Sequence, residues 1–84
     1  MDVNQLIGYE LRTQRLIKRL TIQAVANSLD KSINTISYYE LGKIKITVKD
    51  LIDYCKAIDC DWLEVLQNVN KQLTKRGECT INGI

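Results

Sequence analysis

The sequence predicts an all-α fold in which five short helices pack into one compact domain. Its 84 residues fit a single domain with a small core. They include no proline and only four glycines, the two residue types that interrupt helices most strongly. Apolar residues recur at helical spacing in several short segments, each bounded by residues that commonly begin or end a helix.

The first helix is predicted over residues 4–19. Ile7 and Leu11 share one apolar face of this helix, and Val3 precedes it. A second face carries the three arginines of the segment: Arg12, Arg15 and Arg19.

The second helix is predicted over residues 22–29, with Thr21 as its N-cap. Val25, Ala26 and Leu29 form a compact apolar side. The small side chain of Ala26 permits another helix to cross closely at this point.

The third helix is predicted over residues 33–41. The preceding residues 30–32 are long enough only for a tight turn, and Ser32 can act as the N-cap of the helix. Ile36 and Tyr39 point to one side, which leaves a polar face opposite. Gly42 stands where helices commonly end in a left-handed conformation.

Two further helices are predicted from capping patterns. Thr47 and Asp50 form a capping box with Asp in place of Glu, and open a helix that runs through Ile58. Asp61 and Glu64 repeat this pattern and open a fifth helix that is expected to end at about residue 66.

The domain organisation follows from these elements. Residues 1–66 form the helical domain, and residues 67–84 form a polar C-terminal extension of uncertain structure. The extension is either disordered or part of a dimer interface, since residues 79–81 have some β-strand propensity.

Positive charge is concentrated in the first half of the chain. Residues 1–49 contain eight lysines and arginines against four acidic residues, a net charge of +4. Residues 50–84 contain four basic and six acidic residues, a net charge of −2. This separation allows the first half to present a positive face to phosphates.

The composition argues against catalysis, metal binding and membrane insertion. There is no histidine to activate Ser or Cys, and no Gly-rich phosphate loop, so an enzyme, a cofactor and a small-molecule substrate are not expected. The three cysteines are too few for an all-Cys zinc site, and Cys55 and Cys60 are interpreted as small core residues. No signal peptide or membrane span is apparent, which favours a cytoplasmic, nucleoid-associated location.

The run Ser32-x-x-Thr35-Ile36-Ser37-x-Tyr39-Glu40-x-Gly42-Lys43 is the most specific motif of the chain. It follows Leu20-Thr21, Val25-Ala26 and Leu29, and precedes Ala57-Ile58 and Asp61–Leu66 at fixed spacing. Over these residues the sequence resembles the Cro/repressor-type (xenobiotic-response-element-type) helix-turn-helix family of bacterial and phage transcription regulators. The resemblance implies a lambda-repressor-like DNA-binding domain whose recognition helix lies near residues 32–41.

The resemblance also implies roles for individual residues. Contacts to DNA bases are expected from Ile33, Asn34, Thr35 and Tyr38. Asn34 suits adenine N6 and N7, and Ile33 suits a thymine methyl group. Contacts to DNA phosphates are expected from Thr21, Gln23, Ser32, Ser37, Lys43 and Lys45. A structural ion pair is expected between Arg15 and Glu40.

The sequence departs from the family pattern at several positions. Ile22 replaces the Gln that usually follows the capping Thr and grips phosphate, and Gln23 comes one residue late. Asp30 replaces the usual turn Gly. Leu16 and Ile17 are apolar where polar residues are common, so the first helix is either rotated or in contact with a partner.

The function expected from these features is sequence-specific binding of double-stranded DNA. The protein is expected to be a repressor that binds a palindromic operator as a homodimer, paired through residues from Trp62 onward. The alternative is a protein-interaction module that retains the helix-turn-helix fold without binding specific DNA. The two differ in salt dependence, because phosphate contacts make affinity fall steeply with salt.

Overall fold

The computed structural model describes residues 1–75 and confirms the predicted all-α architecture. Five helices follow one another in the described residues, with no strand among them. They are α1 (Val3–Ile17), α2 (Ile22–Leu29), α3 (Ile33–Leu41), α4 (Val48–Ala57) and α5 (Trp62–Lys75).

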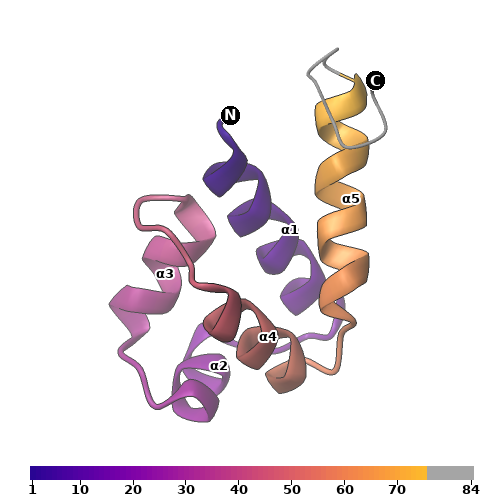
Figure 1. Ribbon diagram of the computed structural model, residues 1–84. Coiled ribbons are helices and arrows are strands. Elements are labelled where there is room, and N and C mark those ends of the chain that lie inside the picture. The colour runs from indigo at the N-terminus through magenta and orange to yellow at the C-terminus, as the bar shows by residue number, and fades with distance from the viewer. Residues whose placement is uncertain (76–84) are drawn as a thin grey trace.

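The five helices pack as a chain of neighbouring pairs. α1 packs against α3 on one side and α5 on the other, while α2 packs against α3 and α4 (Figure 1). α5 runs antiparallel to α1, so its last turns lie beside the N-terminus of the chain. This arrangement leaves one side of α3 and one side of α5 without a helix packed on it.

Side-chain caps begin four of the helices. Asp2, Thr21, Ser32 and Thr47 each accept a hydrogen bond from the backbone N–H three residues later. Such caps satisfy amide groups that have no partner within the helix. The bounds of α2 and α3 agree with the sequence prediction because these caps and the end signals coincide.

The predicted capping box at the start of α4 is only half formed. The Asp50 backbone N–H donates to Thr47 Oγ1 at 3.1 Å, as expected of a cap. The Asp50 carboxylate does not return to the Thr47 backbone, because it accepts a hydrogen bond from Tyr39 of α3 instead. The residue thus joins two helices, which its local sequence pattern does not indicate.

Two helices end in left-handed residues. Asp30 closes α2 with φ 55°, and Gly42 closes α3 with φ 70°. A non-Gly residue in this region costs roughly 1 kcal/mol, and Asp tolerates it better than most residues. A Cβ atom at Gly42 would also lie 2.7 Å from the Cα of Gln5, so glycine is needed there for space as well.

The first helix ends earlier than predicted. Its last residue is Ile17, with Lys18 as C-cap and Arg19 at φ 58°. Arg19 therefore lies in the connection to α2 and not on the arginine face of α1. The predicted helix is two residues too long at this end because no glycine or proline marks the end in the sequence.

The fifth helix is longer than predicted. It continues to Lys75, past the expected end at about residue 66. Val65 and Val69 are buried on one side of it, and Asn68 donates to Glu10 of α1 at 2.8 Å. A single buried stripe is enough to continue a helix along α1 even though most residues after Gln67 are polar. Residues 79–81, considered for a short strand, lie outside the described residues.

The core gathers residues from all five helices. Its completely or almost completely buried members include Leu11, Val25, Ala26, Ile36, Tyr54, Cys55, Ile58 and Val65. Cys55 is a core residue, as interpreted, and the half-buried Cys60 packs against the core. Leu16 and Ile17 are exposed, so their apolar character is not explained by packing within this chain.

Candidate nucleic-acid interface

The second and third helices form a helix-turn-helix. The turn between them closes through the Lys31 backbone N–H, which donates to the Ala26 carbonyl at 2.9 Å. Val25 and Ala26 of α2 and Ile36 of α3 are buried where the helices cross. The N-terminal half of α3 therefore projects from the domain in a fixed direction.

The expected base-contacting residues occupy the outward side of α3. Ile33, Asn34 and Tyr38 are exposed, and Thr35 is half-buried. The Asn34 side-chain amide makes no hydrogen bond to any residue between 1 and 75, which leaves both its donor and its acceptor open. Thr35 differs, because its hydroxyl shares a hydrogen bond of 3.0 Å with the Ser32 hydroxyl.

The expected phosphate-contacting residues are spread around this face. Thr21, Gln23, Ser32, Lys43 and Lys45 are exposed. The hydroxyls of Thr21 and Ser32 cap α2 and α3, and the Gln23 side-chain amide donates to Asn27 at 2.7 Å. The Lys43 Nζ lies 5.6 Å from the centroid of the Tyr38 ring, within the range of a cation–π contact.

Ser37 takes a different position from the other expected phosphate ligands. It is half-buried and lines a groove of about 500 Å³ between α1, α2 and α3. Arg12, Ile22 and Leu41 line the same groove. The structure thus places Ser37 beside α1, away from the exposed lysines that follow α3.

The expected ion pair is present and is bidentate. Arg15 Nε lies 2.8 Å from Glu40 Oε2, and Arg15 Nη2 lies 3.0 Å from Glu40 Oε1. Both side chains are buried, and Arg15 Nη1 also donates to the Leu20 carbonyl at 2.8 Å. The hydrogen bonds with Glu40 raise the pKa of Arg15 despite its burial. The pair fixes α3 to the end of α1.

Tyr54 completes this buried cluster from α4, a role that the sequence alone did not reveal. Its hydroxyl donates to Glu40 Oε2 at 2.7 Å. Burial, reinforced by the Glu40 carboxylate, raises the pKa of Tyr54 far above its ordinary value. A signal for it exists in the sequence, because Tyr54 falls on the stripe of Leu51 and Ile58, and a buried tyrosine hydroxyl needs a partner.

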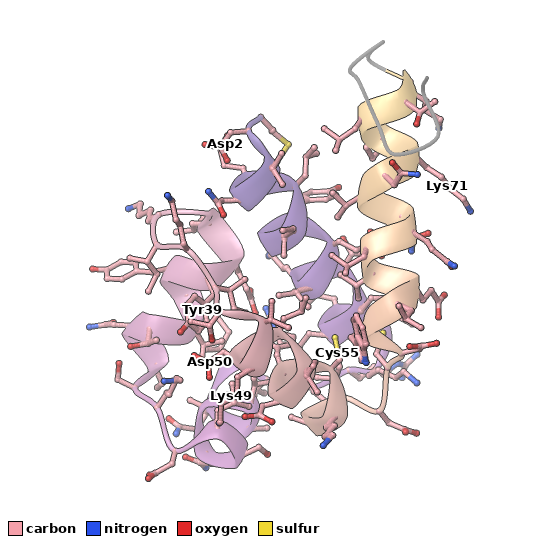
Figure 2. The ribbon with its side chains drawn as sticks, in the orientation of Figure 1. Asp2, Tyr39, Lys49, Asp50, Cys55 and Lys71 are labelled. Carbon is pink, nitrogen blue, oxygen red and sulfur yellow. The ribbon has the colours of Figure 1, made fainter. Side chains whose placement is uncertain are left out.

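A second polar cluster joins α3 to α4 and to the turn. The Tyr39 hydroxyl donates to Asp50 Oδ2 at 2.6 Å, and Lys31 Nζ lies 3.4 Å from the same oxygen. Figure 2 shows Tyr39 and Asp50 facing each other between the two helices. The Tyr39 hydroxyl lowers the pKa of Asp50, and burial raises the pKa of Tyr39 to about 12.

A close backbone contact holds the same C-terminal end of α3 against α1. Gly8 of α1 faces the carbonyl oxygens of Tyr39 and Glu40, and a Cβ atom at this position would overlap both. Glycine is therefore required inside α1, where its low helix propensity would otherwise be a disadvantage. Together with the two polar clusters, this contact holds the C-terminal half of α3 against α1 and α4.

Neither of the two described cysteines belongs to a cluster of metal ligands. No group of three or more His, Cys, Asp or Glu side chains within residues 1–75 is arranged to hold a metal ion. Cys55 and Cys60 are free thiols, and burial raises the pKa of Cys55 to about 12, which keeps it protonated. Across the same residues, no helix is both long and apolar enough to cross a membrane.

Comparison with known proteins agrees with this geometry. A model of the helix-turn-helix family matches residues 11–65, which include the whole of α2, α3 and α4. No curated protein matches the sequence significantly.

Two solved structures of the clp gene regulator ClgR from Corynebacterium glutamicum share the fold. The first has a TM-score of 0.82 at 22% identity, covering 87% of this chain and 95% of that one. The second has a TM-score of 0.84 at 21% identity, covering 92% and 82%. The family match, which covers the helix-turn-helix itself, supports a DNA-binding regulator of transcription.

Proposed function

Because the chain belongs to the Cro/repressor-type helix-turn-helix family, we propose that it represses transcription by binding a palindromic operator as a homodimer. The observation that carries this proposal is the outward side of α3. It is exposed and rich in hydrogen-bonding groups, and buried contacts on the opposite side hold it in place. A rigid helix of this kind is suited to the major groove of B-DNA.

In the proposed complex the N-terminal half of α3 lies against base edges. Asn34 reads adenine, while Ile33, Thr35 and Tyr38 contact neighbouring bases or the adjoining backbone. The support for this is the exposure of Ile33, Asn34 and Tyr38 and the open amide of Asn34.

The phosphate contacts are proposed on both sides of α3. Thr21 and Ser32 stand at the N-termini of α2 and α3, where amide groups and the helix dipole favour anions. Lys43 and Lys45 follow the C-terminus of α3 and are exposed. The two sets would bracket a groove between two strands of backbone.

Homodimerisation is proposed through the uncovered side of α5. A stripe of three leucines and one asparagine runs along it with alternating spacings of three and four residues: Leu63, Leu66, Asn70 and Leu73. Leu63 and Leu66 are exposed, while Val65 and Val69 face α1. This is the heptad spacing through which two helices pair, and a single Asn within such a stripe favours one register.

Repression is the simplest consequence of such binding. A protein that occupies an operator excludes other proteins from that DNA. Repression of this kind requires only the surfaces that bind DNA and form the homodimer. A second copy is needed because one recognition helix buries little area and reads only a few base pairs.

The test is a selection of binding sites from random duplex DNA with the purified protein. The expected winner is a palindrome whose half-sites are about 10–11 bp apart, centre to centre, or at another fixed spacing. A variant with Asn34→Ala, run in parallel, should enrich a site with relaxed preference at one position of each half. Failure to enrich any site would contradict the proposal.

That failure would favour the alternative function, a protein-interaction module with the same fold. The observations on its side are the exposed Leu16 and Ile17 of α1, and Ile22 in place of a phosphate-binding Gln. A module of this kind would bind DNA weakly and without sequence preference.

A further inference from the structure

The outward side of α3 carries no charge. The helix has nine residues, and Glu40 is its only charged one. Glu40 is 6% exposed and is held in the bidentate pair with Arg15. Every side chain that α3 offers to a partner is therefore neutral.

This neutrality restricts which bases the helix can read. Guanine is distinguished in the major groove mainly by Arg or Lys, which donate to its O6 and N7. Cytosine is distinguished by Asp or Glu, which accept from its N4 amino group. α3 exposes none of these four residue types.

The lysines near α3 do not supply the missing donor at its reading end. Lys31 precedes the helix, but its ammonium is drawn back to Asp50, 3.4 Å away. Lys43 follows the opposite end, beyond Gly42, and lies over the Tyr38 ring. The exposed side chains in the first turn of α3 are thus all neutral.

The groups that α3 does expose fit A·T pairs. The open amide of Asn34 can accept from adenine N6 and donate to adenine N7. Ile33 is 46% exposed at the first position of the helix, although nothing in the fold requires an apolar side chain there. Its methyl groups match the thymine C5-methyl, the only apolar feature in the major groove.

We propose that α3 selects A·T pairs, with Asn34 reading adenine and Ile33 packing against a thymine methyl group. The inference deepens the proposed function and rests on it. The ligand is a half-site whose central contacted pairs are A·T, recognised from the major-groove side.

The test replaces each thymine of the selected duplex, one at a time, with deoxyuridine. This removes only the C5-methyl and leaves base pairing and the minor groove intact. At the contacted thymine we expect wild-type affinity to fall about fourfold, the factor that corresponds to one buried methyl-sized group. Uracil elsewhere should have no effect.

Two variants assign the methyl contact to its residue. Ile33→Ala should bind more weakly and should no longer distinguish thymine from uracil at that position. Ile17→Ala, which truncates the same type of side chain at an exposed position on α1, should retain the full discrimination. Both positions are on the surface, so folding is not at stake.

The outcomes separate this inference from the function on which it rests. Enriched half-sites whose contacted pairs are G·C, or specific binding that no uracil weakens, would overturn A·T selection and leave the proposed function intact. Absence of any enriched site would overturn both. An A·T half-site with uracil sensitivity that depends on Ile33 supports the inference.

Discussion

A single carboxylate, that of Glu40, connects three helices at the level of individual residues. It accepts from Arg15 of α1 and from Tyr54 of α4, while belonging to α3 itself. Within the described residues no buried side-chain nitrogen or oxygen lacks a hydrogen-bond partner, so this cluster is fully satisfied. Satisfied buried groups restrict a helix to one orientation, and here that helix is the proposed reader of DNA.

The contribution of Tyr54 can be measured by removing one oxygen. Tyr54→Phe takes away one of the hydrogen bonds to Glu40 and should lower the free energy of unfolding by about 1–3 kcal/mol. Urea denaturation measures this, and Tyr9→Phe on an exposed ring should leave the midpoint unchanged. Equal stability of Tyr54→Phe and wild type would show that the bond contributes nothing net.

The Tyr39–Asp50 pair predicts a loss of stability at both extremes of pH. The pKa of Asp50 is lowered in the fold, so its contribution is present above the ordinary value of 3.8 and is lost as pH falls further. The pKa of Tyr39 is raised from 10.0 to about 12, so its contribution is present below pH 10 and is lost between 10 and 12. Thermal melting across pH 2–11.5 measures both losses of stability, the acid limb below pH 3.8 and the basic limb above pH 10.

Tyr39→Phe is the variant that assigns these limbs. It removes the hydroxyl that lowers the pKa of Asp50, so both limbs should become flatter than in wild type. Tyr54 retains a basic limb of its own, since its pKa is also raised. Unchanged slopes in Tyr39→Phe would contradict the role assigned to the pair.

Base-reading and phosphate-binding residues should respond differently to truncation. Asn34→Ala should cost about 1–3 kcal/mol of binding free energy on the preferred site and relax selection at one base position.

Lys45→Ala should weaken binding to all duplexes alike and reduce the salt slope by about one. Equal losses of Asn34→Ala on matched and mismatched sites, or an unchanged slope for Lys45→Ala, would remove that residue from its proposed role.

Among the elements, helices with clear signals at both ends were predictable. α2 and α3 have an N-cap hydroxyl and a left-handed end residue, and their bounds agree with the prediction. The end of α1 lacks such a signal, and α5 continues through a polar stretch because one side of it packs on α1. Tertiary packing can override local propensity in this way, and no glycine or proline marks the end of α1 in the sequence.

The site was predictable to a similar extent. The exposure of Ile33, Asn34 and Tyr38 and the pair between Arg15 and Glu40 follow from the motif. The roles of Tyr54, Gly8 and Asp50 do not, because each depends on an atom of another helix more than ten residues away. Residues that anchor the proposed recognition helix are therefore harder to identify from the sequence than residues exposed on its surface.

The element that tests the proposed dimer is α5. The double variant Leu63→Lys, Leu66→Lys would place like charges on the stripe of each copy. It should therefore be a monomer in analytical ultracentrifugation. Affinity for the full palindrome should fall strongly, while affinity for a half-site should change little. Glu64→Lys, an exposed position off the stripe, should remain dimeric; a dimer in the double variant would refute the interface.

At the scale of the whole molecule, net charge differs between the two halves of the chain. The first 49 residues have a net charge of +4 and include α1, α2 and α3, whereas the remainder has a net charge of −2 and includes most of α4 and all of α5. The positive half of the sequence therefore contains the proposed reading helix, and the other half contains the stripe proposed for pairing. The neutral outward side of α3 leaves phosphate attraction to residues around it.

The most direct test of sequence-specific binding through α3 is a salt titration of binding to the selected duplex and to a scrambled duplex of equal composition. The logarithm of each binding constant should fall linearly with the logarithm of salt concentration, by about 0.9 per neutralised phosphate. The selected duplex should bind at least about a thousandfold more tightly at physiological salt. Equal affinity for both duplexes, or affinity insensitive to salt, would contradict sequence-specific DNA binding through α3.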